Sequence, residues 1–220
     1  IASCLVGSEM CIRDSLYIDE VNLLEDHIVD LLLDVAASGE NLVERDGISI
    51  RHSSKFVLIG SGNPEEGELR PQLLDRFGFS VNVGSPSEIS QRIEVIKRRD
   101  EFERDPKTFL RKWKHKDLTV QKKIIHAKNT LDNIKLDDSI LSKCAEICIA
   151  VGSDGLRGEL TLLRALRALC AFNETTKPTL EDIREIAVYT LSHRLRRDPL
   201  DDTSSEVRVK RKVNELIDDK

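Results

Sequence analysis

The chain has 220 residues and a net charge of −5, and its basic and acidic residues are interspersed, which argues against a protein whose main role is to hold nucleic acid by charge. No apolar run approaches the roughly 18 residues of a membrane-crossing helix and no secretory signal pattern occurs, so the sequence predicts a cytoplasmic protein without a membrane span. The five cysteines form no CxxC pair and no cluster with histidine, which argues against a disulfide framework or a zinc site.

Two strands are predicted in the first third of the chain. Residues 16–20 form a short apolar run that ends in Asp19 and Glu20, and residues 56–59 form a second run that leads into a glycine-rich loop carrying Asn63. Both runs are typical of buried parallel strands. Because the carboxyl ends of such strands meet at one edge of the sheet, we expect the two carboxylates and Asn63 to lie close together there.

The other predicted elements are a hairpin and a series of helices. Apolar residues at helical spacing predict a helix over residues 24–39, and the β-prone stretch 43–50 reads as a hairpin that turns at Asp46-Gly47. Residues 86–137 are charged and sparsely apolar, as in a helical insert. Amphipathic patterns then predict helices over 139–151 and 159–172.

The end of the chain predicts one more helix and a tail. A capping-box sequence at Thr179–Asp182 opens a helix that runs to about residue 195. From residue 198 onward a proline, a Thr-Ser-Ser cluster and mixed charge predict a poorly ordered or peripheral end. The fold class is therefore α/β in the first part, followed by a helical insert and a C-terminal helical bundle.

Adjacent carboxylates at a strand end suit the hydrolysis of a magnesium nucleotide. Asp19 would hold Mg²⁺ through water, and Glu20 would orient the attacking water. Asn63 stands where a side-chain amide could hold the same water. Taken alone, an apolar-Asp-Glu run is equally typical of a surface strand end, and it is the second strand that favours the catalytic interpretation.

Three arginines are candidates for contact with phosphate. Arg76 follows Asn63 at a short helix's length and could reach a nucleotide held by a neighbouring subunit, and Arg70 is a weaker candidate for the same role. Arg157 lies near the start of a helix after a glycine-flanked loop, where a lid-borne arginine could contact phosphate. The alternatives are a surface ion pair between Arg76 and Asp75, and simple solvation of Arg157 at a helix end.

Four stretches together resemble one family. LYIDEVNLL, GSGNPEEGELRPQLLDRFG, DGLRGELTLLRA and HRLRRDPLD are similar to subunit I of magnesium chelatase, an AAA+ ATPase of chlorophyll and bacteriochlorophyll biosynthesis. The resemblance covers residues 16 to 204. It implies a bacterial subunit that uses ATP and Mg²⁺, forms a homo-oligomeric ring, commonly a hexamer, and works with partner subunits D and H to insert Mg²⁺ into protoporphyrin IX.

The resemblance also assigns roles to residues of this chain. Asp19 and Glu20 match the Walker B pair, Asn63 matches sensor 1, Arg76 the arginine finger and Arg157 sensor 2. Whether Arg157 serves the nucleotide of its own subunit or that of a neighbour stays open, because in this family a helical insert displaces the lid.

The start of the sequence departs from the family. No G-x-x-x-x-G-K-[ST] phosphate loop occurs in the 220 residues, so we expect the chain alone to be inactive and poorly soluble. Residues 5–14 resemble instead the conceptual translation of a sequencing-library adapter, so we predict that residues 1–15 are not native protein. A divergent N-terminal arm is the alternative.

The predicted organisation is a non-native segment followed by four parts. These are the C-terminal half of an AAA+ α/β core with a partial parallel sheet and a β-hairpin insert (16–85), a helical insert (86–137), a helical lid bundle (138–197) and a tail (198–220). Two other functions remain open at this point. One is a related AAA+ motor, such as a cobalt-chelatase small subunit, a MoxR-type chaperone or an MCM-like helicase, and the other is a non-catalytic ring-assembly module.

Overall fold

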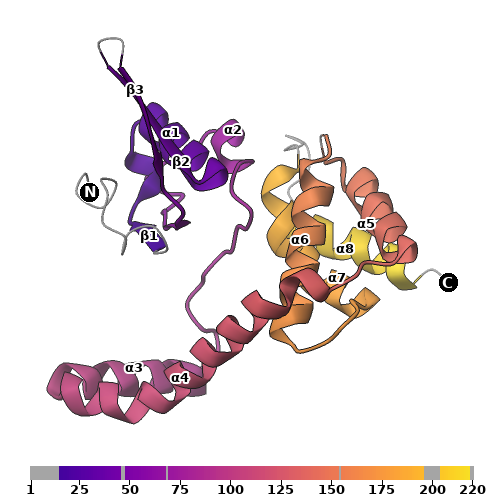
Figure 1. Ribbon diagram of the computed structural model, residues 1–220. Coiled ribbons are helices and arrows are strands. Elements are labelled where there is room, and N and C mark those ends of the chain that lie inside the picture. Colours follow the sequence, from indigo (N-terminus) through magenta and orange to yellow (C-terminus); the bar gives the residue numbers. More distant parts are fainter. Residues whose placement is uncertain (1–14, 46–47, 68, 154, 196–203, 219–220) are drawn as a thin grey trace. The chain divides into compact units, whose positions relative to one another are not determined.

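The computed structural model describes residues 15–45, 48–67, 69–153, 155–195 and 204–218 (Figure 1). The chain divides into two compact units, Ile1–Gly78 and Phe79–Lys220. Of the predicted non-native segment, residues 1–14 lie outside the described residues, and Ser15 is the first residue of strand β1. No helix among the described residues is long and apolar enough to cross a membrane.

The first unit contains the predicted pair of parallel strands. Strand β1 (Ser15–Ile18) pairs with β4 (Val57–Gly60) in a register that sets Leu16 opposite Leu58. A 3₁₀ helix, η2 (Val21–Leu23), follows β1 and leads to α1 (Asp26–Ser38). The short helix α2 (Pro71–Leu74) completes the unit. The predicted strand, helix and strand of this region are therefore present.

The core of the first unit lies between α1 and the strands. Val29 and Leu33 of α1 pack with Val21 and Leu73, and partly buried apolar residues of the strands join them. The prediction that both strands are buried is wrong for the described residues, because Tyr17 is 60% exposed and Val57 is 66% exposed. The two-stranded sheet packs on α1, and alternate side chains of each strand point away from that helix.

The predicted hairpin is present and extends from the first unit. Strand β2 (Glu40–Arg45) pairs antiparallel with β3 (Ile48–Ser53), and Figure 1 shows the pair projecting beyond α1. The turn at residues 46–47 lies outside the described residues. Every residue of β3 is exposed, and no described residue of the hairpin belongs to the buried cluster of the unit.

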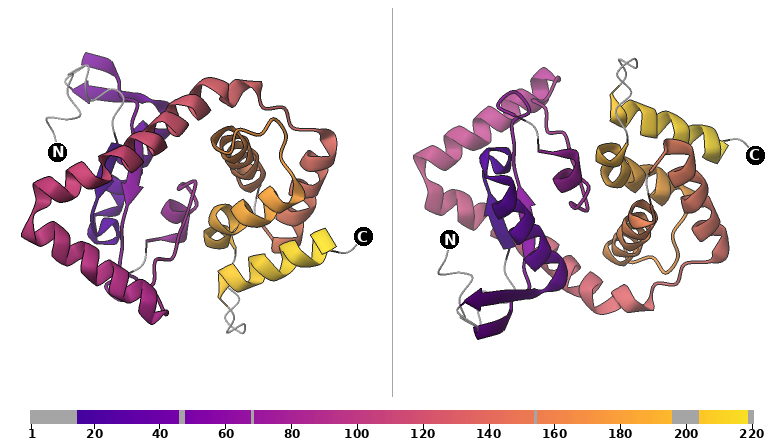
Figure 2. Two further views of the ribbon diagram at one scale, coloured as in Figure 1. Left: turned by 90° about the horizontal axis from the view of Figure 1, so that it is seen from below. Right: turned by 90° about the horizontal axis from the view of Figure 1, so that it is seen from above.

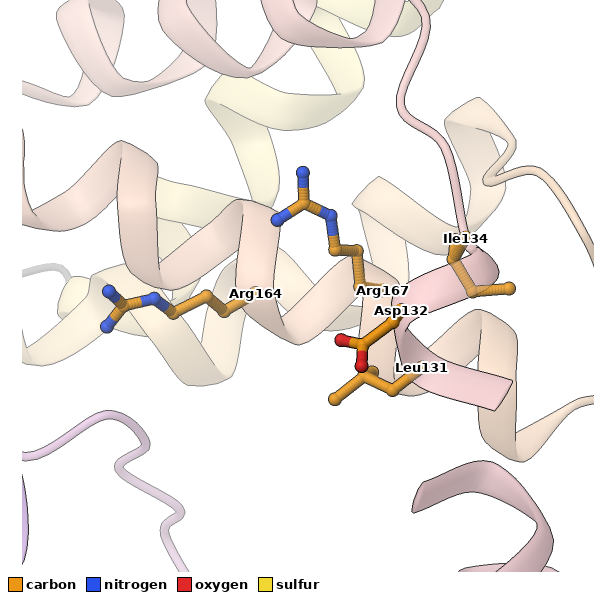
Figure 3. A pocket seen from close by; sticks show the side chains of 5 residues that line it. All are labelled: Leu131, Asp132, Ile134, Arg164 and Arg167. Carbon is orange, nitrogen blue, oxygen red and sulfur yellow. The ribbon is translucent and has the colours of Figure 1, made fainter. Parts of the chain in front are cut away.

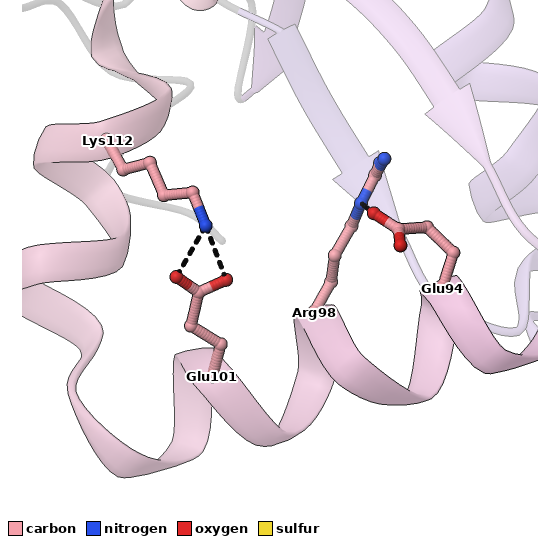
Figure 4. A network of polar contacts seen from close by, with 4 residues as sticks. All are labelled: Glu94, Arg98, Glu101 and Lys112. Carbon is pink, nitrogen blue, oxygen red and sulfur yellow. Dashed lines mark hydrogen bonds and ion pairs between the residues drawn. The ribbon is translucent and has the colours of Figure 1, made fainter.

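The second unit opens with the predicted helical insert. Helices α3 (Ile89–Arg104) and α4 (Pro106–Thr130) run side by side, and neither contains a buried residue. Phe102 and Phe109 meet edge to face at 5.6 Å between ring centroids, and Lys112 Nζ pairs with Glu101 at 2.7 Å (Figure 4). Such exposed contacts hold two helices together with little help from burial.

The remaining helices form a bundle with its own core. They are α5 (Asp138–Val151), α6 (Arg157–Phe172), α7 (Leu180–Leu191), η4 (Ser192–Arg194) and α8 (Ser205–Asp218), with η3 (Leu131–Asn133) before them. Ile147, Leu162, Leu166 and Ile183 are fully buried at its centre. The predicted capping box is present, since the Thr179 side chain accepts from Asp182 N and the Asp182 side chain accepts from Thr179 N.

The prediction of a poorly ordered or peripheral tail is wrong for residues 205–218. They form α8, whose Val209 and Val213 are fully buried against the bundle, and both views of Figure 2 show α8 lying along the other helices. Apolar residues at positions 209, 213 and 217 recur every four residues, which is the spacing of a helix with one buried face. In the sequence, Pro199 precedes this helix, and the Thr-Ser-Ser cluster ends in Ser205, its first residue.

Candidate functional site

The two strand ends of the first unit meet through Asp19. The side chain of this residue leaves the end of β1, and its Oδ1 accepts hydrogen bonds from Ser61 Oγ and from Tyr17 OH, the latter at 3.2 Å. These two bonds stabilise the ionised form and lower the pKa of the Asp19 carboxyl. The group is therefore an exposed carboxylate at neutral pH, held in place by the loop that follows β4.

Backbone contacts join the same two loops. Ser61 N donates to Ile18 O at 2.9 Å, and Val21 N donates to Ser61 O at 2.8 Å. Gly60 allows this approach, since a Cβ atom there would lie 2.9 Å from Cγ1 of Val21. Glu20, between these contacts, has φ 52° and ψ 48°, a left-handed conformation that is uncommon outside glycine and concentrates at functional sites.

Asn63 lies at the same edge of the sheet, as the sequence predicted. Its Oδ1 accepts from Glu65 N at 3.1 Å, which forms a local turn, and its backbone oxygen accepts from Asn22 Nδ2 at 3.3 Å. Asn22 Nδ2 also donates to Gly67 O at 3.0 Å, so this one side chain ties η2 to both ends of the 63–67 loop. The site thus comprises Asp19 and Glu20 after β1, and Asn63 after β4.

The two candidate arginines of the first unit, Arg70 and Arg76, both pair with α1. Arg76 Nη1 lies 2.8 Å from Asp30 Oδ1 and 2.7 Å from Asp34 Oδ1, and Arg70 Nε lies 2.5 Å from Asp26 Oδ2. The partners of Arg76 are therefore on α1, in place of the alternative pair with Asp75. The three aspartates are four residues apart, so they form one row along the helix.

Arg157 lies in the second unit, as the first residue of α6, and is exposed. Its backbone oxygen accepts a hydrogen bond at 2.7 Å from Oγ1 of Thr161, which lies one turn further along the helix. Gly158 beside it is buried, and a Cβ atom there would lie 2.3 Å from Ser153 Oγ. The predicted position of Arg157 at a helix start is confirmed, and its role stays a prediction.

A second group of arginines lines a surface hollow in the same unit. Arg164 and Arg167 of α6 border it together with Leu131, Asp132 and Ile134 (Figure 3). Figure 3 shows the two guanidinium groups pointing in different directions, so they do not converge on one ligand position. We therefore assign no role in phosphate binding to this pair.

Several residues that shape the site were not singled out from the sequence. Ser61 and Asn22 hold the two loops together, and Asp30 and Asp34 hold Arg76. The spacing of the aspartates is visible in the sequence as a polar row opposite the apolar face of α1. The contacts of Ser61 carry no such local signal, because they join residues about 40 positions apart.

Comparison with known proteins identifies relatives of the chain. Residues 141–215 match the family model described as the AAA lid domain. The chain is 58% identical over 205 residues to the magnesium-chelatase 38 kDa subunit of Rhodobacter capsulatus, covering 93% of this chain and 59% of that protein. Over nearly its whole length, the chain is therefore similar to magnesium-chelatase 38 kDa subunits. Magnesium-chelatase subunit ChlI of Anabaena variabilis, another relative, is 50% identical over 199 residues, covering 90% of this chain and 59% of that protein.

The comparisons also establish the fold. The crystal structure of a proposed ATPase from Cytophaga hutchinsonii superposes with a TM-score of 0.65 at 16% identity, covering 90% of this chain and 64% of that one. The fold is that of an AAA+ protein, with part of the α/β core followed by a helical lid that includes α8. The chain spans 59% to 61% of the length of the Rhodobacter capsulatus and Cereibacter sphaeroides relatives.

Proposed function

We propose that this chain is part of the ATPase motor subunit of magnesium chelatase. In a homo-oligomeric ring, ATP hydrolysis by the motor drives the insertion of Mg²⁺ into protoporphyrin IX by partner subunits D and H. The observation that carries the proposal is the 58% identity with a relative that bears the name magnesium-chelatase 38 kDa subunit. The position of Asp19, Glu20 and Asn63 after two paired parallel strands, at one edge of the sheet, supports it chemically.

The residues at the strand edge fit a magnesium nucleotide. Mg²⁺ in nucleotide sites is held by one or two carboxylates together with water and phosphate oxygens. Asp19 provides such a carboxylate, since hydrogen bonds from Ser61 and Tyr17 keep it ionised. Both of these bonds end on Oδ1, and among the described residues no side chain donates to Oδ2. Asp19 would therefore hold the metal through water with Oδ2.

Glu20 and Asn63 would act on the attacking water. A bound magnesium nucleotide supplies the phosphoryl group and the charge that develops on it. The Glu20 carboxylate would orient and polarise the water, and the Asn63 amide, whose Oδ1 is fixed by Glu65 N, would hold it from the neighbouring loop. The contacts of Ser61 with Ile18 and Val21 keep the two loops at a fixed separation.

The arginines would stabilise the transferred phosphoryl group. Arg76 is the proposed finger that reaches the nucleotide of a neighbouring subunit, with Arg70 as the weaker candidate for that role, and Arg157 is the proposed sensor 2 on the lid. An arginine finger contributes roughly 10³ to 10⁵ in rate where other nucleotide hydrolases have been measured. Arg76 is suited to this work because its side chain is ordered by two carboxylates before any neighbour arrives.

The test uses a hybrid subunit, in which residues 16–220 follow the amino-terminal part of the Rhodobacter capsulatus relative. With subunits D and H, ATP and Mg²⁺, the hybrid should convert protoporphyrin IX to its magnesium form, which is followed by fluorescence. Glu20→Gln should abolish both ATPase and chelation, whereas Glu25→Gln, an exposed glutamate at the start of α1, should retain both. A hybrid that assembles and hydrolyses ATP without supporting chelation would point to a related AAA+ motor.

A further inference from the structure

Two aspartates of α1 contact the same end of the Arg76 guanidinium group. Asp30 and Asp34 lie one turn apart on the same face of the helix, and both carboxylates contact a single nitrogen, Nη1, at 2.8 and 2.7 Å. The side chain of Arg76 is 34% exposed, so it is neither buried nor free in solvent. Arg70 has a single partner, Asp26, one turn earlier, and its side chain is 75% exposed.

This arrangement leaves one edge of the guanidinium group available. Arginine donates from Nε, Nη1 and Nη2, and its Nε–Nη2 edge can bind two oxygens of a phosphate or carboxylate at once. Among the described residues, Arg76 donates only from Nη1. The aspartates therefore anchor the group at one nitrogen, and Nε and Nη2 have no partner among the described residues, so that edge can take a second anion.

We propose that Asp30 and Asp34 are positioning residues that hold Arg76 in the orientation in which it contacts the phosphate of a nucleotide bound by a neighbouring copy of the subunit. The inference rests on the proposed function, and in particular on Arg76 as the finger. The added point is that Arg76 keeps its contacts with Asp30 and Asp34 while it contacts the phosphate. Ordering this long side chain in advance reduces the entropy lost when the phosphate contact forms.

The two carboxylates do not cancel the charge that Arg76 presents. Their side chains are 47% and 67% exposed, so water weakens these two ion pairs, whereas the proposed contact with phosphate takes place in a closed interface from which water is excluded. The opposite reading is a latch, in which Asp30 and Asp34 sequester Arg76 until it is released. The two readings predict opposite changes in activity when the carboxylates are removed.

The test compares variants of the hybrid subunit. In Asp30→Asn/Asp34→Asn, the kcat for ATP hydrolysis should fall roughly ten- to hundredfold, because a finger displaced by about 1 Å loses much of its effect. The affinity for ATPγS relative to ADP, measured by fluorescence titration, should fall toward that of Arg76→Ala, while the affinity for ADP stays unchanged. Asp26→Asn is the matched control on the same helix face, and its kcat should stay within about twofold of the parent, as is usual for exposed substitutions.

The outcomes separate the positioning role from the proposed function. If Arg76→Ala itself keeps the parent kcat, the finger assignment fails and the positioning role fails with it. If Arg76→Ala is inactive while the double variant keeps or exceeds the parent kcat, Arg76 remains the finger and only the positioning role is overturned. A general loss of folding is recognised by a lower urea midpoint of the double variant, and the single variants Asp30→Asn and Asp34→Asn then provide the same comparison with less perturbation.

Discussion

The last helix, α8, should contribute measurably to the stability of the lid bundle. Val209 and Val213 are fully buried, so replacing either with alanine removes two carbons from a closed core. Each buried carbon is worth about 0.8 kcal/mol of transfer free energy, and the cavity that remains adds to the loss. We therefore expect Val213→Ala to lower the free energy of unfolding of the lid by about 2 kcal/mol.

A probe specific to the lid measures this loss in the hybrid subunit. Cys144 and Cys148 are fully buried in the same core, so their alkylation in increasing urea, read on their peptides by mass spectrometry, follows the unfolding of the bundle. With a denaturant slope of about 2 kcal/mol per M, the midpoint should fall by about 1 M. Val207→Ala, at a position of α8 that is 53% exposed, is the control and should shift the midpoint very little. Equal midpoints for the two variants would refute the placement of α8 in the core.

Three other parts of the molecule give outcomes that can be checked in the hybrid subunit. Gly60→Ala should reduce magnesium-dependent ATPase strongly without unfolding the lid, since the new methyl group would lie 2.9 Å from Val21 and push apart the two loops that follow β1 and β4; a variant with parent activity would contradict this contact. In folded protein at pH 8, Cys144 and Cys148 should react with iodoacetamide roughly 10³ times more slowly than an ordinary thiol, because burial raises the pKa of each to about 12; peptide mapping measures the rates, and ordinary rates would contradict the burial. The pKa of Asp19 is lowered, so its carboxyl stays ionised at pH values below the usual titration range of aspartate and loses its charge only as the pH falls through the lowered value. An NMR titration of its carboxyl carbon should give a midpoint below that of a free aspartate, and an ordinary midpoint would argue against the hydrogen bonds to Oδ1.

Local patterns in the sequence were sufficient to predict the strands and helices that carry the candidate site. The apolar runs ending in Asp19 and before Asn63 predicted two strands with a shared edge, and the structure pairs them in parallel. The capping box at Thr179 likewise predicted the start of α7, because all of its hydrogen bonds lie within four consecutive residues. Such signals can be read from sequence since the interactions that produce them are local.

The features that the sequence did not reveal depend on contacts between distant residues. Ser61 reaches Asp19 and Arg76 reaches Asp34, and in each pair the two residues are 42 positions apart. The helical spacing of Val209 and Val213 was present in the sequence, but the proline and serine residues before it led to the prediction of a tail. The turn-forming residues at the start of this segment were thus less informative about its structure than the helical spacing of its apolar residues.

We propose that two neighbouring copies of the subunit complete one catalytic site, with Glu20 from one copy and Arg76 from the next. The most direct test mixes equal amounts of the Arg76→Ala and Glu20→Gln hybrid subunits, each inactive alone, and measures magnesium-dependent ATP hydrolysis. The mixture should regain activity, since some interfaces then join an intact Glu20 to an intact Arg76. A mixture that stays inactive, while both variants bind nucleotide and assemble, would contradict the claim that Arg76 acts across the interface.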